Sequence, residues 1–270
     1  MQMNSNSNNP WVVRWRPNHK ASLRLFCFPY AGGAASIYRT WGNSLPSHIE
    51  VCSIQPPGRG ARMAEPPMTN LPDILRALSR SIRPYLDLPF AFFGHSMGAF
   101  LSFELARLLR TEQGVRPAHL FVSGCRALQL HDPERPTYNL PEPEFIEELR
   151  RLGGTPAEVL EHPELLSLIL PLLRADFELC QTYRYTPDLP LNCPITAFGG
   201  TEDHVGREEL EAWREQTTAS FALRMFPGDH FFLHGAESKI LEIVAQKLSP
   251  EQRKLSRGNS QELVLAASKL

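Results

Sequence analysis

Short apolar runs alternate along most of this chain with longer segments that carry apolar residues at every third or fourth position. The short runs predict strands, because a strand buried on both faces is apolar at successive positions, whereas the periodic segments predict helices. The expected strands are residues 23–28, 49–54, 89–93, 119–123, 195–198 and 221–226. The expected helices are residues 71–86, 99–112 and 235–248. This alternation predicts an α/β fold, with a mostly parallel central sheet flanked by helices on both faces.

The alternation stops between residues 124 and 194, where the sequence shows no strand pattern. Three helical patterns occupy this region instead, at residues 143–151, 155–161 and 163–183. We interpret about 125–193 as a helical lid inserted after a strand of the core. Its leucines either form a small helical core or roof an apolar channel, and one helix can do both. Pro171 lacks a backbone N–H and is expected to kink or split the third helix.

The domain organisation follows from these boundaries. The 270-residue chain is expected to hold one α/β domain at residues 21–248, which includes the lid. Residues 1–20 begin with a polar, asparagine-rich stretch that lacks the apolar core of a signal peptide, so we expect a disordered leader there. Residues 249–270 form a charged and polar tail that includes a short apolar patch. The most apolar segment of the chain is too short to span a bilayer, so we expect no membrane association.

Composition and charge narrow the function classes. With 42% hydrophobic residues, 21% charged residues and a formal net charge of −1, the chain resembles an ordinary globular protein. Nucleic-acid binding, which generally requires a basic excess, is not expected. The five cysteines are an odd number without a Cys-x-x-Cys pair, so neither disulfides nor a metal site is expected and a reducing cytoplasm is the expected location. We expect the thiols to pack in the core. For Cys125 and Cys180 the alternative is a position near a ligand channel.

One pentapeptide carries the main indication of chemistry. Gly-His-Ser-Met-Gly at residues 94–98 follows an apolar strand and precedes a helix, which is the context of the nucleophile elbow in α/β-hydrolases. The glycines remove side chains that would collide in so tight a turn, and Ser96 is thereby held out at the top of the sheet. The backbone N–H of Met97, at the start of the helix, is then free to stabilise a developing negative charge. The alternative is a serine that only caps the helix.

A serine hydroxyl needs a base to activate it, and the base needs a carboxylate to orient it. In α/β-hydrolases the acid and then the histidine follow the serine along the chain. Asp203 lies directly after the fifth expected strand and is the predicted acid, the alternative being a cap for a helix that begins near Gly206. His230 follows the last strand and is the predicted base. Ser96, Asp203 and His230 are therefore the predicted catalytic triad.

The second donor to an oxyanion should come from the loop after an early strand. Residues 28–36 contain two adjacent glycines and other small residues, which let the backbone approach a ligand closely. The N–H of Ala31 is the predicted donor, beside that of Met97. The alternative is a flexible Gly-Gly turn without such a role.

Three further histidines lie near these motifs and receive other roles. His204 is expected to face solvent, His234 to lie at the start of a helix, and His95 to support the elbow by packing.

Together these segments resemble the type II, or editing, thioesterases that accompany polyketide synthases and nonribosomal peptide synthetases. The resemblance covers about residues 23–248 and is specific because many separate segments match at once. They are FPYAGG at 28–33, QPPGRG at 55–60, GHSMGA at 94–99, GGTEDHV at 199–205 and GDHFFL at 228–233, with LGGTP at 152–156 and LPLLRAD at 170–176 in the lid. Asp229 departs from the family pattern, which has a second glycine there, and adds a charge near His230.

The resemblance implies a serine thioesterase that releases acyl groups from the phosphopantetheine arm of acyl or peptidyl carrier proteins. It would remove stalled or mis-primed chains in polyketide or nonribosomal peptide biosynthesis, without a metal or cofactor of its own. We expect a cytoplasmic monomer whose partners are carrier protein domains. The alternatives are a carboxylesterase or acyltransferase using the same triad, and a non-catalytic protein that binds carrier domains. Four arginines either contact an acidic carrier protein or belong to ordinary solvated surface. They are Arg59, Arg62, Arg126 and Arg174.

Overall fold

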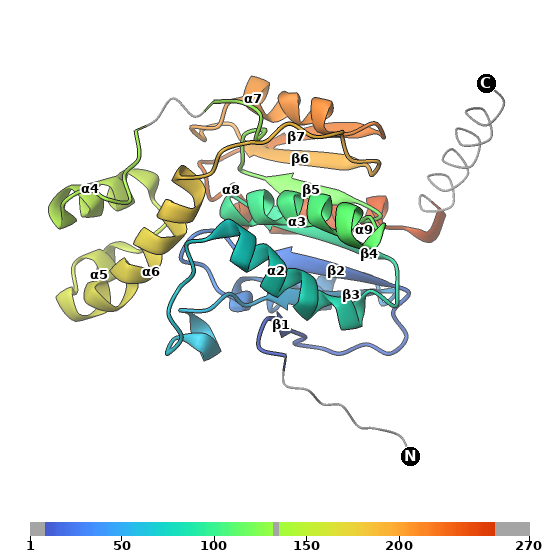
Figure 1. Ribbon diagram of the computed structural model, residues 1–270, viewed down its shortest axis with the longest axis horizontal. Coiled ribbons are helices and arrows are strands. Elements are labelled where there is room, and N and C mark those ends of the chain that lie inside the picture. Colours follow the sequence, from blue (N-terminus) through green and yellow to red (C-terminus); the bar gives the residue numbers. More distant parts are fainter. Residues whose placement is uncertain (1–8, 132–134, 252–270) are drawn as a thin grey trace, which may run out of the picture.

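The computed structural model describes residues 9–131 and 135–251, and its centre is a seven-stranded sheet (Figure 1). The strands are β1 (Val12–Val13), β2 (Leu23–Phe28), β3 (Ile49–Ile54), β4 (Phe90–His95), β5 (Leu120–Ser123), β6 (Ile195–Gly200) and β7 (Phe221–Phe226). They lie in the order β1-β3-β2-β4-β5-β6-β7. All neighbours are parallel except β1 and β3. The predicted α/β-hydrolase fold, with a mostly parallel sheet, is confirmed.

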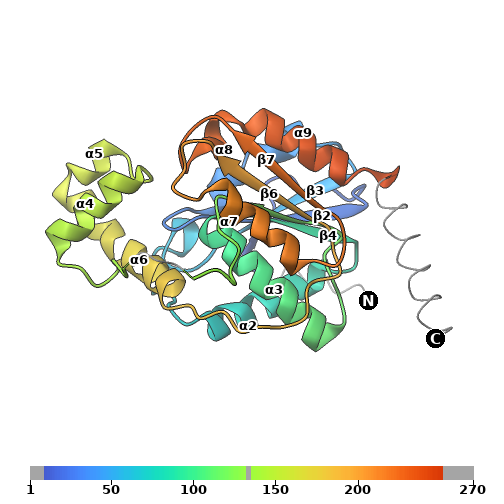
Figure 2. The ribbon, with the colours of Figure 1, turned by 90° about the horizontal axis from the view of Figure 1, so that it is seen from above.

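Helices cover both faces of this sheet (Figure 2). The α-helices are α1 (Trp41–Ser44), α2 (Leu71–Ile82), α3 (Met97–Gln113), α4 (Glu142–Leu152), α5 (Ala157–Leu160), α6 (Pro163–Gln181), α7 (Arg207–Glu211), α8 (Phe232–Gly235) and α9 (Glu237–Lys247). Short 3-10 helices are η1 (Ala35–Tyr38), η2 (Gly60–Arg62), η3 (Arg83–Tyr85) and η4 (Ala212–Gln216). Side chains of α2, α3 and α7 pack on one face, and side chains of α1, α8 and α9 pack on the other.

Alternate residues of the same strand belong to opposite faces. On β2, Phe26 and Phe28 pack toward α2 and α3, whereas Leu23 and Leu25 pack toward α1 and α9. This is the two-residue period of an extended chain. Because both faces are covered, the strand is apolar at almost every position, which explains the continuous apolar runs in the sequence.

The segment between β5 and β6 forms a separate helical body of α4, α5 and α6, which projects from one end of the domain (Figure 2). It has an apolar cluster of its own, distinct from the two clusters on the sheet. The buried members of this cluster are Phe145, Leu149, Leu160, Leu166, Leu170 and Leu173. Three leucines of α6 therefore do form the small helical core that was one of the two interpretations. We call α4–α6 the lid.

One expectation about the chain differs from the structure. Val12 and Val13 form β1, with Trp11 and Val12 buried against the sheet, so the folded domain begins within the predicted leader. A two-residue strand is too short to give a pattern in the sequence. Of the two effects expected of Pro171, a kink or a split, the split does not occur, since helix α6 runs through this residue. The carbonyl that loses its donor belongs to Ser167, which is exposed, so water can satisfy it.

The N-terminal eight residues and the tail from residue 252 lie outside the described residues, as do residues 132–134. None of the helices within the described ranges combines the length and the apolarity that crossing a membrane would require.

Candidate active site

Ser96 lies in a sharp turn between β4 and α3, at φ 53° and ψ −119°. Within the described ranges it is the one residue other than glycine with a positive φ. Such backbone strain is retained where the surrounding structure enforces it. A Cβ added at Gly94 would lie 2.1 Å from the carbonyl oxygen of Gly98, and one at Gly98 would lie 2.1 Å from that of Phe28. The two flanking glycines are therefore required by close backbone contacts, as the sequence predicts.

Asp203 and His230 are brought together by the ends of neighbouring strands. Asp203 follows β6 and His230 follows β7, and these strands pair in parallel, so their carboxyl-terminal loops lie side by side. Both carboxylate oxygens of Asp203 lie 3.1 Å from Nδ1 of His230. The Asp203 side chain is fully buried, and that of His230 is 13% exposed. Asp203 is thus oriented toward an imidazole; helix α7 is capped instead by Glu209, which accepts the Gly206 N–H at 2.7 Å.

A second imidazole also contacts Asp203. Nδ1 of His204 lies 2.9 Å from Oδ1 of Asp203, and the rings of His204 and His230 are 5.0 Å apart at their centroids. His204 does face solvent as expected, with its side chain 34% exposed, but it also contacts the predicted acid. The sequence gives no local sign of this contact, because adjacent residues in a loop have no fixed relative orientation.

The charge state of Asp203 follows from these contacts. Burial alone would raise the pKa of its carboxyl, but hydrogen bonds from His204 and His230, together with their charges, outweigh burial and hold the pKa well below the usual range. The carboxylate is therefore ionised at neutral pH. An ionised carboxylate only accepts hydrogen bonds, so Nδ1 of His230 carries the proton and its Nε2 is available as a base.

His230 lies next to the elbow. Its ring is 5.1 Å from that of His95, which precedes Ser96, and a Cβ at Gly124 would lie 3.4 Å from Cε1 of His230. Ser123, just before Gly124, accepts the Ser96 N–H at 2.7 Å. Among the described residues no hydrogen bond joins the Ser96 hydroxyl to His230. Such bonds are commonly long in ligand-free enzymes and shorten when substrate is bound.

His95 supports the elbow from below, as expected. It is fully buried, and its Nδ1 lies 2.9 Å from the Ser123 hydroxyl. Burial, followed by the nearby charge of His230, lowers the pKa of His95 well below its usual value, so this ring stays neutral.

The loop after β2 forms a tight turn in which the donors can be assigned one by one. The Gly33 N–H closes the turn onto the Tyr30 carbonyl at 2.9 Å, and the Gly32 N–H donates to Asp176 at 2.7 Å. Gly32 has φ +75°, which a side chain would strain. In the described chain the N–H of Ala31 has no protein acceptor, and neither has that of Met97 at the first position of α3. Both predicted oxyanion donors are thus free to bind a ligand.

Two of the arginines considered for carrier contact are buried instead. Arg59 is 4% exposed and forms a two-pronged ion pair with Asp176 of α6, at 2.7 and 2.8 Å. Arg62 is 7% exposed and pairs with Glu65 at 2.6 Å. The interpretation that these two arginines contact an acidic carrier protein is therefore wrong. The pairing of Arg59 with Asp176 was not predicted, since 117 positions separate the two in the chain.

Asp229, the departure from the family pattern, has a local structural role. Its carboxylate accepts the Phe231 N–H at 2.8 Å and so closes the turn that leads from His230 into α8. The three side chains Asp203, His204 and His230 also lie close enough together to hold a metal ion. Their hydrogen bonds to one another account for this geometry without one.

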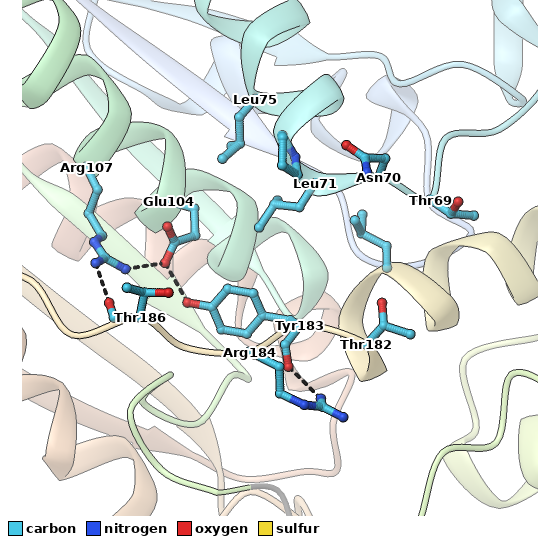
Figure 3. Close-up of a pocket in the computed structure, with 12 residues that line it drawn as sticks. Thr69, Asn70, Leu71, Leu75, Glu104, Arg107, Thr182, Tyr183, Arg184 and Thr186 are labelled. Carbon is cyan, nitrogen blue, oxygen red and sulfur yellow. Dashed lines mark hydrogen bonds and ion pairs between the residues drawn. The ribbon is translucent and has the colours of Figure 1, made fainter.

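A groove lies elsewhere on the described surface, between α2, α3 and the end of α6 (Figure 3). It has a volume of about 480 Å³, and Glu104 in it is paired with both Arg107 and Tyr183. A much smaller cavity of about 10 Å³ lies next to Met97. It is mostly apolar, and its lining includes Met68, Ile74, Leu101 and Leu179.

The sheet order, the strained serine at the end of β4 and the two loops that follow β6 and β7 define an α/β-hydrolase. A sequence model of the family described as "Thioesterase domain" matches residues 23–250. The gramicidin S biosynthesis protein GrsT of Aneurinibacillus migulanus is 51% identical over 241 residues, covering 89% of this chain and 94% of the relative. The chain belongs to the thioesterase family and is a hydrolase that acts on thioesters.

Solved structures agree with this assignment. The type II thioesterase BorB from the borrelidin biosynthetic cluster superposes with a TM-score of 0.81 at 37% identity, covering 88% of this chain and 98% of BorB. The thioesterase RedJ from the prodiginine pathway of Streptomyces coelicolor superposes with a TM-score of 0.80 at 39% identity, covering 86% of this chain and 89% of RedJ. The resemblance to type II thioesterases found in the sequence is therefore confirmed.

Proposed function

We propose that this protein hydrolyses acyl thioesters held on the phosphopantetheine arm of acyl or peptidyl carrier domains. It would thereby clear stalled or mis-primed chains from a polyketide or nonribosomal peptide synthase. The observation that carries the proposal is the buried, ionised Asp203 paired with His230 beside the strained Ser96. The relatives named for borrelidin, prodiginine and gramicidin S biosynthesis support the substrate class.

In the proposed first step, the Ser96 hydroxyl attacks the thioester carbonyl while Nε2 of His230 takes its proton. Asp203 keeps the opposite ring nitrogen protonated and stabilises the imidazolium that forms. The carbonyl oxygen becomes an oxyanion, which accepts hydrogen bonds from the N–H groups of Met97 and Ala31. When the intermediate collapses, the C–S bond breaks and His230 returns the proton to the pantetheine sulfur.

In the second step, His230 takes a proton from water, and the resulting hydroxide attacks the acyl group on Ser96. A second oxyanion forms in the same place and collapses, so that the Ser96 oxygen leaves with the proton from His230 and the carboxylic acid is released. Side chains, backbone N–H groups and water carry every step, so the proposal requires no metal or cofactor from the protein. We propose the cytoplasm, where such synthases act, as the location.

The acyl chain needs an apolar surface next to the oxyanion donors. Met68, Leu101 and Leu179 lie around the small cavity beside Met97 and provide one, with Leu179 contributed by the lid helix α6. The cavity is too small for an acyl chain as it stands, so the side chains that line it would rearrange when the chain enters.

The test is the Ser96→Ala variant, assayed for release of free acid from an acylated carrier protein. We expect turnover to fall by roughly 10³-fold or more, because the nucleophile is lost while the fold is kept. Ser102→Ala is a matched control. Ser102 is a buried serine of helix α3, which Ser96 directly precedes, and its hydroxyl bonds only to the Ala99 carbonyl. It should retain turnover within a few-fold.

Near-normal turnover by Ser96→Ala would show that the proposed chemistry is wrong. The remaining alternatives are separated with the wild-type protein. A faster reaction with simple oxoesters than with carrier thioesters would indicate a carboxylesterase, and product formed only with an added alcohol or amine would indicate an acyltransferase.

A further inference from the structure

A buried ion pair joins the lid to the loops beside the nucleophile. Asp176 on α6 is 2% exposed, and Arg59 on the loop after β3 is 4% exposed. Nη1 and Nη2 of Arg59 each donate to a different carboxylate oxygen of Asp176, at 2.7 and 2.8 Å. This two-pronged geometry fixes the carboxylate in both position and plane.

The same carboxylate holds the turn that contains Ala31. Oδ2 of Asp176 accepts the Gly32 N–H at 2.7 Å, and Nη1 of Arg59 donates to the Gly33 carbonyl at 3.3 Å. The Gly32 N–H belongs to the peptide group that joins Ala31 to Gly32. Fixing this peptide plane restricts the backbone angles of Ala31, and with them the direction of the Ala31 N–H.

The lid helix packs on this turn through the side chain of Leu173. A Cβ at Gly32 would lie 2.7 Å from Cδ2 of Leu173, which is three residues before Asp176 on α6. One helix therefore packs on the turn through Leu173 and bonds to it through Asp176.

Attachment of the lid alone does not explain the charges. Taking two charges out of water is costly, and a well-packed apolar pair generally stabilises a fold as much as a buried ion pair or more. An apolar side chain at position 176 would leave the partly buried Gly32 N–H without its protein acceptor. The carboxylate thus has a specific task at the turn.

We propose that Asp176, held by Arg59, is a positioning residue of the reaction: it orients the turn at residues 30–33 so that the Ala31 N–H faces the developing oxyanion. This inference rests on the proposed function, because it assumes that Ser96 attacks next to Ala31. The oxyanion donor is then in place only when α6 is seated. Helix α6 also carries Leu179, which lines the small apolar cavity beside Met97 where we place the acyl chain. The lid therefore links binding of the acyl chain to the correct orientation of the Ala31 N–H.

The experiment uses the full-length protein with hexanoyl-pantetheine as substrate, so that carrier docking has no part in it. Two ligands separate ground-state binding from oxyanion binding. The hexanoyl-pantetheine amide analogue reports binding of the unreacted substrate, and pentylboronic acid forms a tetrahedral anion with Ser96 that occupies the oxyanion site. The variants are Asp176→Asn and the apolar pair Arg59→Met/Asp176→Leu. If Asp176→Asn does not fold, the double variant still allows the proposal to be tested.

We expect both variants to lower kcat by about 10²-fold, the usual effect of losing one oxyanion donor, with KM changed by less than about threefold. The inhibition constant of pentylboronic acid should rise by a similar factor, while the dissociation constant of the amide analogue stays nearly constant. Arg174→Gln is the control, since Arg174 lies on the same helix but contacts Tyr138 and Phe145 of the lid segment. It should change neither constant by more than about threefold.

The inference is overturned if a folded variant keeps its wild-type kcat. It is also overturned if the amide and the boronic acid are weakened equally, since the pair would then serve only to seat the lid. Either result, combined with an inactive Ser96→Ala, rejects the positioning role alone. An active Ser96→Ala rejects the proposed function itself.

Discussion

The two sides of the candidate site are held in place by different forces. On the sheet side, Ser96 is fixed by backbone atoms, because Gly94 and Gly98 lie in contact with carbonyl groups that leave no room for a side chain. On the lid side, α6 is fixed by a small apolar cluster and by the ion pair of Asp176 with Arg59. The sheet side is therefore rigid by construction, whereas the lid side can change without disturbing the sheet. The following predictions test this difference.

The sheet side should tolerate no added atom at the elbow, and Gly98→Ala should have the largest effect. Its Cβ would lie 2.1 Å from the Phe28 carbonyl oxygen, so β2 and the start of α3 must move apart. We expect kcat/KM to fall by at least about 10²-fold, because Ser96 is displaced from His230 and from the oxyanion donors. Thioester hydrolysis, measured alongside circular dichroism to verify folding, checks this expectation.

Gly42→Ala is the matched control for that substitution. Nothing lies within 4 Å of a Cβ at Gly42, which is in helix α1, so alanine should be neutral or slightly stabilising there. A Gly98→Ala variant that is as active as Gly42→Ala would mean that the elbow can relax, and the contrast between the two sides would be lost.

The lid side should lose order on its own. Phe145 is fully buried in the lid cluster, and replacing it with alanine generally costs about 3–5 kcal/mol. Because this cluster is separate from the two on the sheet, we expect Phe145→Ala to open the lid locally. Limited proteolysis should cut the lid faster, while the urea midpoint of the main unfolding transition moves little.

Leu168→Ala provides the comparison for Phe145→Ala. Leu168 is on the same body but 66% exposed, so its truncation should alter neither proteolysis nor the unfolding midpoint noticeably. If Phe145→Ala instead shifts the main transition by its full cost, the lid and the sheet unfold as one unit.

The parts of the fold that the sequence predicts are those with a local signature. Residues 90–93 are an apolar run because β4 is covered on both faces, and residues 94–98 combine a strand end, two glycines and a helix start. Asp203 and His230 follow from the rule that the carboxyl ends of parallel strands share one edge. In each case the deciding contacts are made by backbone or by neighbours in the chain.

The parts that the sequence misses depend on contacts between distant side chains. Arg59 and Asp176 are 117 positions apart, and an arginine in a polar, glycine-rich loop resembles any solvated charge. Asp176 lies between Arg174 and Glu178 in the helical pattern, and nothing in the sequence marks it as the buried member of these three charges. The contact of His204 with Asp203 was not predicted, because the orientation of His204 depends on the loop geometry around Asp203.

The smallest predicted effect concerns pH, and it belongs to the sheet side. His119 is 4% exposed beside β5, and its Nε2 lies 2.8 Å from the Thr196 hydroxyl. Burial, and secondarily the charge of Lys247, lowers the pKa of His119 to about 3, against 6.5 for an ordinary histidine. Below pH 6.5 the unfolded chain binds a proton that the folded protein does not. Stability should therefore be complete above this pH and fall by up to about 1.4 kcal/mol per pH unit toward pH 3.

The measurement is the difference between the urea unfolding free energies at pH 7.5 and pH 5. His119→Gln should make this difference smaller than in the wild type, because the glutamine does not titrate. His162→Gln, at an exposed position of the lid, should leave it unchanged. If the two variants depend on pH alike, burial in the sheet does not keep the His119 ring neutral. The remaining loss of stability at low pH would then belong to other groups, among which the buried His95 shifts in the same direction.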